Sequence, residues 1–149
     1  MHERKILNSR EVKQIRKLIE EQWGTEIGDY VFMQKGDDIF ITSRDIERIP
    51  IDRLRVNSIG LYMGELRHGE LRLSIEGSQI IGKDARRNIF ELDDSQKFSW
   101  IKGDDIDTGS EAKGFVLIRY GNDFLGCGKI KDGRVINYYP KSRRVHADI

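Results

Sequence analysis

Near its end the chain carries a dense group of basic side chains with two tyrosines among them. Between Lys129 and Arg144 only Asp132 opposes the basic residues, and Tyr138 and Tyr139 lie in the same stretch. The basic residues are Lys129, Lys131, Arg134, Lys141, Arg143 and Arg144. Arginine and lysine side chains bind phosphate oxygens, and tyrosine rings can stack on unpaired bases. The combination predicts an RNA-binding surface.

The predicted local structure gathers several of these cations. Lys129 and Lys131 lie two apart on a predicted strand and therefore point to the same face. A turn at Asp132-Gly133 would bring Arg134 close to them, and Pro140-Lys141 would extend the positive surface. The alternative is a solubilising basic tail that protects an edge strand. The share of arginine and the tyrosines between the cations favour RNA.

Catalytic side chains are sparse. His2, His68 and His146 lack the spacing of a metal-binding pair and are interpreted as solvated residues. Cys127 stands between two glycines in a predicted strand, where a small apolar filler is expected more often than a reactive thiolate.

The acidic stretch Asp104-Asp105-Ile106-Asp107 has ligands that suit Mg²⁺ or Ca²⁺, but it lacks the spacing of a calcium loop. It is interpreted as a solvated loop. The sequence also has no glycine-rich phosphate loop and no nucleophile elbow. We therefore expect no enzymatic activity, no metal site and no cofactor.

Composition limits the protein class. The 149 residues allow one domain or two very small ones, and their net charge of +1 excludes a uniformly basic protein. A single cysteine excludes an internal disulfide. No apolar run approaches the roughly 20 residues of a membrane span, and the N-terminus leads into a polar helix. We expect a cytoplasmic protein without membrane contact.

The first half reads as one α+β unit. A helix is predicted over Ser9–Trp23, with Asn8 and Glu11 as a capping box and Gly24 as its end. The other predicted elements are strands 30–33 and 39–42 around a turn at Lys35-Gly36-Asp37, a helical turn 44–49 capped by Ser43 and ended by Pro50, and strands 56–66 and 71–73.

The second half is predicted to be rich in short strands. A helical turn over 75–82 leads to a strand over 88–92. Asp94 is then expected to cap a short helix that ends near Gly103. An acidic loop over 104–109 precedes three strands, 114–120, 124–130 and 135–139. Gly126 and Gly128 would leave backbone open to a strand or a nucleotide, or provide the bend that closes a barrel.

Three short motifs of this half resemble a PUA domain. They are Lys102-Gly103-Asp104-Asp105-Ile106, Gly114-Phe115-Val116-Leu117-Ile118 and Leu125-Gly126-Cys127-Gly128-Lys129. The tail, 131–144, is similar to the end of the PUA domain in Sun-type RNA cytosine-5 methyltransferases. PUA domains are RNA-binding pseudo-barrels attached to RNA-modifying enzymes. The resemblance implies an RNA groove beside the short helix, which brings in Lys102, Gly103, Lys129, Lys131 and Arg134.

The first half resembles the N-terminal domain of the Nip-seven ribosome-biogenesis factors, which occur in archaea and eukaryotes. The resemblance lies in Asp38–Ser43, Ile59–Leu66 and Leu71–Ser74. Together the two resemblances imply an α+β protein in which a small N-terminal α/β domain, 1–74, precedes a C-terminal PUA-like β-barrel, 75–149.

The sequence thus predicts a non-catalytic protein that binds structured rRNA or tRNA in ribosome biogenesis or RNA modification. Pre-ribosomal or RNA-modification proteins are the further partners expected. The alternatives are a protein-interaction adaptor, or a non-catalytic subunit of an RNA-modifying enzyme. The expected RNA-binding residues are Lys102, Gly103, Lys129, Lys131, Arg134, Tyr138, Lys141, Arg143 and Arg144.

Overall fold

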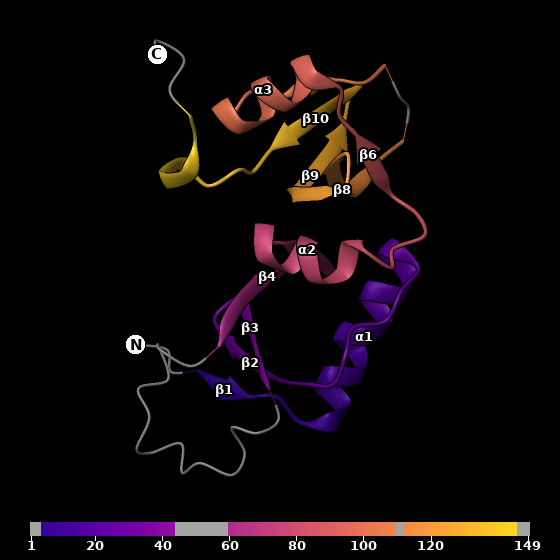
Figure 1. Ribbon diagram of the computed structural model, residues 1–149. Coiled ribbons are helices and arrows are strands. Elements are labelled where there is room, and N and C mark those ends of the chain that lie inside the picture. Colours follow the sequence, from indigo (N-terminus) through magenta and orange to yellow (C-terminus); the bar gives the residue numbers. More distant parts are fainter. Residues whose placement is uncertain (1–3, 44–59, 110–111, 146–149) are drawn as a thin grey trace.

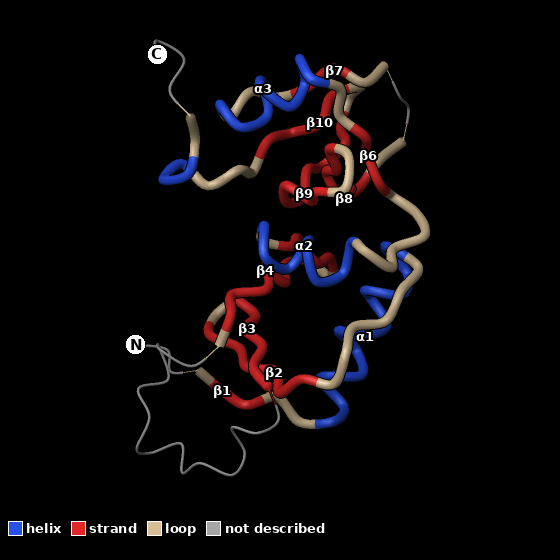
Figure 2. Tube along the Cα trace, in the orientation of Figure 1, coloured by secondary structure: helices blue, strands red, loops and turns tan. Residues whose placement is uncertain are grey.

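The computed structural model describes residues 4–43, 60–109 and 112–145. It contains two five-stranded sheets, one from each half of the chain, with helix α2 (Ile75–Gly82) between them (Figure 1). Helix α1 runs along one side of the first sheet, and helix α3 lies across the far side of the second (Figure 2). The predicted α+β class is confirmed.

The first sheet is an antiparallel meander in which strands follow one another in chain order. Its strands are β1 (Lys5–Ile6), β2 (Tyr30–Lys35), β3 (Asp38–Ser43), β4 (Leu61–Arg67) and β5 (Glu70–Leu73). Both predicted hairpins form, and the turn of the first is Gly36-Asp37 between Lys35 and Asp38. The helical turn predicted over 44–49 and the beginning of the strand predicted from 56 lie outside the described residues.

Helix α1 (Ser9–Trp23) has the predicted bounds and caps. The Asn8 side chain accepts from the backbone N–H of Glu11 at 2.9 Å, and the Glu11 carboxylate accepts from the N–H of Asn8 at 3.1 Å. Gly24 ends the helix in the left-handed conformation, where its N–H donates to Glu20. The apolar stripe packs on the sheet through Ile15, Ile19 and Trp23, which are buried.

The second sheet curls into a half-barrel in the order β6-β8-β9-β10-β7. Its strands are β6 (Ile89–Glu91), β7 (Ile106–Asp107), β8 (Gly114–Tyr120), β9 (Asp123–Lys131) and β10 (Arg134–Asn137). Strand β6 pairs parallel to β8, and the other pairs are antiparallel. Helix α3 (Asp94–Lys102) closes the half-barrel with Trp100, whose indole N–H donates to the carbonyl of Leu125 at 2.9 Å.

Three details of this half differ from the sequence prediction. Asp93, and not Asp94, caps α3, because its side chain accepts from the N–H of Gln96 in a capping box. The acidic loop contains strand β7, since Ile106 and Asp107 pair with β10. Strand β10 ends at Asn137, whose side chain binds the backbone of the α3 end and turns the chain away from the sheet.

Helix α2 joins the halves through close backbone packing. A Cβ atom at Gly77 would lie 2.2 Å from the carbonyl oxygen of Met63, so only glycine fits against β4. On the other side, the buried hydroxyl of Ser78 accepts from the N–H of Gly126 on β9 at 3.0 Å. The helix therefore fixes the two sheets to each other.

One hydrophobic cluster extends through both halves. It includes Trp23 of α1 and Phe32 of the first sheet, together with Leu117 and Phe124 of the second. A second cluster around Trp100 belongs to the C-terminal half. Halves of about 75 residues would each be marginal alone, and the shared cluster shows how their apolar surfaces are covered.

The C-terminal end of α1 is capped by the second half. The carbonyls of the last helical turn accept from the Arg87 and Asn88 side chains and from the N–H of Arg86. Cationic and amide donors at this end satisfy carbonyls that have no partner within the helix. Among the described residues no helix is long and apolar enough to cross a bilayer.

Gln22 offers a test of the contact between α1 and β5. Its amide accepts from the N–H of Leu71 at 3.0 Å and donates to the Leu71 carbonyl at 2.9 Å, so it replaces a neighbouring strand at this sheet edge. Gln22→Ala leaves both backbone groups unpaired beside a fully buried leucine. We expect the free energy of unfolding in urea to fall by about 1–3 kcal/mol.

Gln14→Ala is the matched control, because Gln14 lies exposed on the same helix. An equal loss of stability in the two variants would contradict the role given to Gln22.

Candidate functional site

The tip of the β9–β10 hairpin carries two of the predicted cations. Lys131 and Arg134 are register partners that flank the turn Asp132-Gly133, as predicted. Arg134 lies 3.3 Å from Asp107 across the β10–β7 pair, and both side chains are largely exposed. Lys131 is exposed and has no acidic partner among the described residues. An exposed ion pair contributes little, so both cations remain able to bind phosphate.

Lys102 and Gly103 lie at the C-terminal end of α3. Gly103 adopts the left-handed conformation (φ 100°), and its N–H closes the last turn of the helix. The Arg144 side chain packs against this glycine, where a Cβ atom would lie 2.5 Å from its Nε. The same Nε donates to the carbonyl of Tyr139 at 3.0 Å. Arg144 therefore has a structural role, which holds the tail against α3.

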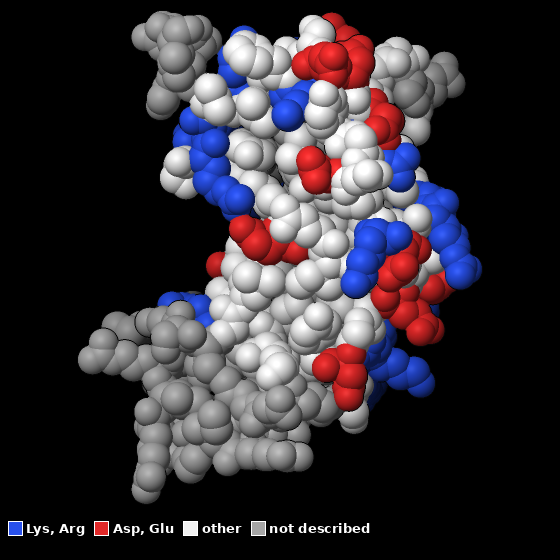
Figure 3. Space-filling view, viewed as in Figure 1, with Lys and Arg blue, Asp and Glu red and all other residues white. Residues whose placement is uncertain are grey.

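The segment after β10 turns back toward the first half. Residues Lys141–Arg143 form a 3-10 turn, η4. Lys141 is exposed and has no acidic partner in the described part of the chain. Arg143 forms an ion pair with Glu76 of α2, with 2.6 Å between Nη1 and Oε1. In Figure 3 basic side chains line the upper edge of a hollow between the halves, with an acidic group directly opposite.

Lys129 and Tyr138 both lie near Phe115, on the side of the sheet that faces the first half. The Lys129 ammonium lies 5.2 Å from the centre of the Phe115 ring, which is 6.2 Å from that of Tyr138. Arg72, on β5, places its guanidinium 4.4 Å from the centre of the Tyr138 ring. The nine predicted residues thus occupy the α3 end, the hairpin tip, the tail and this side, and do not form one cluster.

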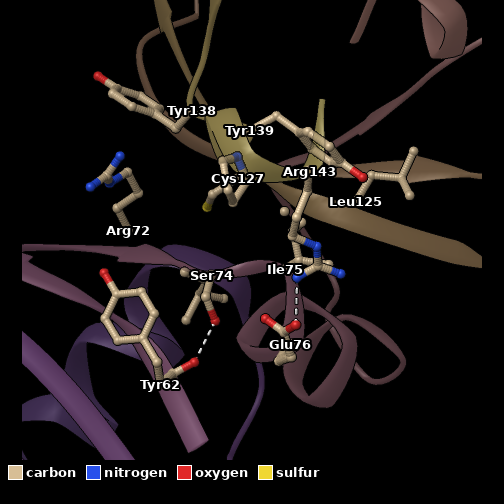
Figure 4. A pocket seen from close by; sticks show the side chains of 13 residues that line it. Tyr62, Arg72, Ser74, Ile75, Glu76, Leu125, Cys127, Tyr138, Tyr139 and Arg143 are labelled. Atoms are coloured by element: carbon tan, nitrogen blue, oxygen red, sulfur yellow. Dashed lines mark hydrogen bonds and ion pairs between the residues drawn. The ribbon is translucent and has the colours of Figure 1, made fainter. Parts of the chain in front are cut away.

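A cavity of about 300 Å³ lies between the halves. Figure 4 shows its side chains: Arg72 lies between Tyr138 and Tyr62, and Arg143 reaches down to Glu76. The full lining is Tyr62, Arg72, Leu73, Ser74, Ile75, Glu76, Leu125, Gly126, Cys127, Tyr138, Tyr139, Pro140 and Arg143. Burial, with Asp38 nearby, raises the pKa of Tyr62 to about 12, so this hydroxyl is a neutral donor.

Sequence reasoning did not select Arg72 and Tyr62 as site residues. Arg72 stands between two apolar residues of a predicted strand, and this alternation gives no sign of a functional role. Its approach to Tyr138 depends on how α2 places β5 against the second sheet.

The two glycines around Cys127 have different surroundings. A Cβ at Gly128 would lie 2.3 Å from Cγ1 of Val135 and 3.1 Å from Trp100, so this glycine serves packing within the half-barrel. Gly126 has φ +99° and lies at the cavity wall, where the nearest atom to an added Cβ belongs to Ile75 at 3.5 Å.

The acidic loop serves the fold. Asp105 accepts from the N–H of Asn137 at 2.8 Å, and Asp107 is the ion-pair partner at the hairpin tip. Asp104 lies 3.8 Å from Lys102. Within the described residues, no group of three or more acidic, histidine or cysteine side chains has the geometry to hold a metal ion.

Comparison with known proteins identifies the C-terminal half. The family model of the methyltransferase RsmF PUA domain matches residues 87–145. This part of the chain thus matches a PUA domain in sequence, and its sheet curls into a half-barrel. The match agrees with the resemblance of the tail to the methyltransferase PUA, whereas the resemblance of the first half to Nip-seven factors stays a prediction.

Relatives of the chain carry the name ribosomal RNA small subunit methyltransferase F. That of Shewanella oneidensis is 25% identical over 135 residues, which cover 89% of this chain and 28% of the relative. That of Vibrio cholerae is 25% identical over 86% of this chain and 27% of the relative. The protein of Aeromonas salmonicida is 26% identical, with 91% and 28% covered.

These alignments reach beyond the PUA domain. A match over 89% of the chain includes most of the residues before 87, so the similarity extends through the first sheet. The chain spans about 28% of the length of the relatives it matches.

The Cys127 thiol provides a test of its packing role. Burial raises its pKa to about 12, so the thiol is neutral at about pH 8. We expect a thiol reagent to label Cys127 far more slowly in the native protein than in guanidinium chloride. Labelling at the same rate in both would contradict its burial.

Arg144 provides a second test. Arg144→Ala removes the hydrogen bond to Tyr139 and the cover over Gly103, so we expect the free energy of unfolding to fall by about 1 kcal/mol. Lys141→Ala, three residues earlier and exposed, should change it by less than about 0.5 kcal/mol. Urea unfolding of both variants measures the difference, and equal stabilities would refute the structural role.

Proposed function

We propose that the chain is a non-catalytic RNA-binding module that binds structured RNA through its PUA domain, with rRNA or tRNA as the target. The observation that carries the proposal is the match of residues 87–145 to the PUA domain of the methyltransferase RsmF. Relatives of the chain are named ribosomal RNA small subunit methyltransferase F. RNA helices expose their phosphates and minor groove, so the module recognises shape more than sequence.

The free and weakly paired cations of the PUA domain suit this task. Lys131 and Lys141 project from the hairpin tip and the tail without acidic partners among the described residues. Lys102 and Arg134 have acidic neighbours that are themselves exposed, at 3.8 and 3.3 Å. Such pairs are weak and exchange readily for a phosphate. Lys129 adds a further cation beside the hairpin.

The remaining proposed residues shape the surface around these cations. Gly103 has no side chain, which leaves room for the Arg144 side chain to pack on the end of α3. Arg143 and Tyr138 face the hollow between the halves, where an RNA strand can follow the tail. Arg144 thus keeps the tail in place, while the lysines contact phosphate.

Two observations support the proposal that the chain is non-catalytic. The alignment covers about 28% of a methyltransferase relative, and the part matched by a family model is its PUA domain. The lone cysteine is buried, and burial raises its pKa. The alignment of 89% of this chain covers about 28% of the relative. A second candidate is therefore a non-catalytic subunit or adaptor in an RNA-modification complex, with the enzyme in another chain.

RNA binding can be tested with the double variant Lys131→Ala/Lys141→Ala. Each lysine that contacts a phosphate releases about one counterion, so the slope of log K against log salt should become shallower by about 2. We expect weaker binding to a blunt RNA hairpin at every salt concentration, measured by filter binding. The effect should be similar for hairpins of different sequence, because phosphate contacts carry no sequence information.

Lys13→Ala/Lys17→Ala is the matched control, since these lysines lie exposed on α1. The proposal fails if the unaltered chain shows no salt-sensitive binding to any structured RNA. It also fails if the control weakens binding as much as the hairpin and tail variant does.

A further inference from the structure

The space between the halves carries the features of a nucleotide site. Two hollows adjoin there: the cavity of about 300 Å³ and a groove of about 250 Å³ along the β4–β5 hairpin. Arg72 and Tyr138 line both. We call the two together the seam. Pockets that enclose a small ligand begin at about this volume, so the seam has room for an unpaired nucleotide and not for a helix.

Aromatic rings border the seam from both halves. Tyr62 comes from β4, Phe115 from β8, and Tyr138 from the tail. Tyr62 and Tyr138 are each more than a third exposed, although large aromatic rings at a packed joint are usually covered. Exposed rings of this kind are the surfaces on which unpaired bases stack.

Arg72 already shows the stacking that such rings support. Its planar guanidinium lies 4.4 Å from the centre of the Tyr138 ring, and Figure 4 shows it between Tyr138 and Tyr62. A nucleobase is likewise planar and stacks on an aromatic face. Glu65, 3.1 Å from Arg72, holds the guanidinium on the β5 side and leaves its remaining donors to the seam.

Arg143 supplies charge at the other side of the cavity. It reaches the cavity from the tail, and its partner Glu76 stands at the beginning of α2. Between Arg72 and Arg143 the wall is apolar and includes Ile75 and Leu125. Two arginines on either side of an apolar wall match the phosphates and base of one nucleotide. Glu76 offers acceptors for the amino group of a base.

We infer that the seam binds an unpaired nucleotide of a single-stranded segment next to the structured RNA. The base stacks on Tyr62 and on the Arg72 guanidinium that covers Tyr138, and Arg143 binds its phosphate. This inference rests on the proposed function and adds the first half of the chain to the RNA contact. The segment must be single-stranded, because bases in a helix are not free to enter a cavity of this size.

The experiment compares two RNAs on the full chain. One is a blunt hairpin, and the other is the same hairpin with a short single-stranded 3′ extension that contains the fluorescent base 2-aminopurine. We expect the extension to tighten binding about tenfold, the value of one good base stack. We also expect the 2-aminopurine fluorescence to be quenched when the base stacks.

The test variants are Arg72→Gln and Tyr62→Leu, which leave unchanged the two lysines tested for hairpin binding, Lys131 and Lys141. Each should remove the gain from the extension and the quenching, while affinity for the blunt hairpin stays unchanged. Arg119→Gln and Tyr120→Leu are the matched controls. Arg119 pairs with Glu91 and Tyr120 lies under Lys97, so they reproduce the same kinds of contact away from the seam.

The outcomes separate the two proposals. If the blunt hairpin binds and the extension adds neither affinity nor quenching, the seam inference is overturned and the proposed function stands. The inference is also overturned if the gain survives in both seam variants. If the blunt hairpin itself does not bind, the proposed function fails. Thermal unfolding of each variant confirms the fold, and Arg143→Gln, scored by quenching alone, replaces a seam variant that does not fold.

Discussion

The structure depends on the burial of helix α2 between two small sheets. Neither half of the chain has enough apolar surface to form a large core of its own. The main hydrophobic cluster therefore runs from Trp23 through α2 to Phe124. Because Gly77 allows the helix backbone to touch β4, and Ser78 binds the backbone of β9, the sheets have a defined relative position. Every contact across the seam follows from that position.

Charge acts locally in this protein. The net charge of +1 gives no indication of a nucleic-acid partner. Along the basic run, Arg143 and Arg144 hold the tail by short contacts to Glu76 and Tyr139, whereas Lys131 and Lys141 remain free among the described residues. Arg144 thus positions the segment, Arg143 pairs with Glu76 at the cavity, and the lysines keep charge available for a ligand. A count of basic residues would treat these two groups alike.

The sequence was sufficient to predict features that depend on residues close together in the chain. The capping box of Asn8 and Glu11, the turn at Asp132-Gly133 and the bounds of α1 were predictable because short-range geometry decides them. The cap at Asp93 was missed by one position, since two adjacent aspartates both suit a cap. Strand β7 was missed because two residues are too few to show a period.

Contacts between residues far apart in the chain could not be predicted from the sequence. The stacking of Arg72 on Tyr138 joins residues that approach only when both sheets pack on α2, and no local pattern encodes that approach. The PUA motifs nevertheless indicated the C-terminal fold, because the glycines among them mark positions where only glycine fits, such as Gly128 under Trp100.

The cap that the second half places on α1 affects where this chain can be divided. The family match begins at residue 87, but Arg86, Arg87 and Asn88 are the residues that satisfy the last carbonyls of α1. A cut at that border would expose helix carbonyls on one piece and the apolar side of β8 and β9 on the other. An engineered fusion that carries only one of the two halves would therefore lose the contacts that complete α1 and cover this side of the second sheet.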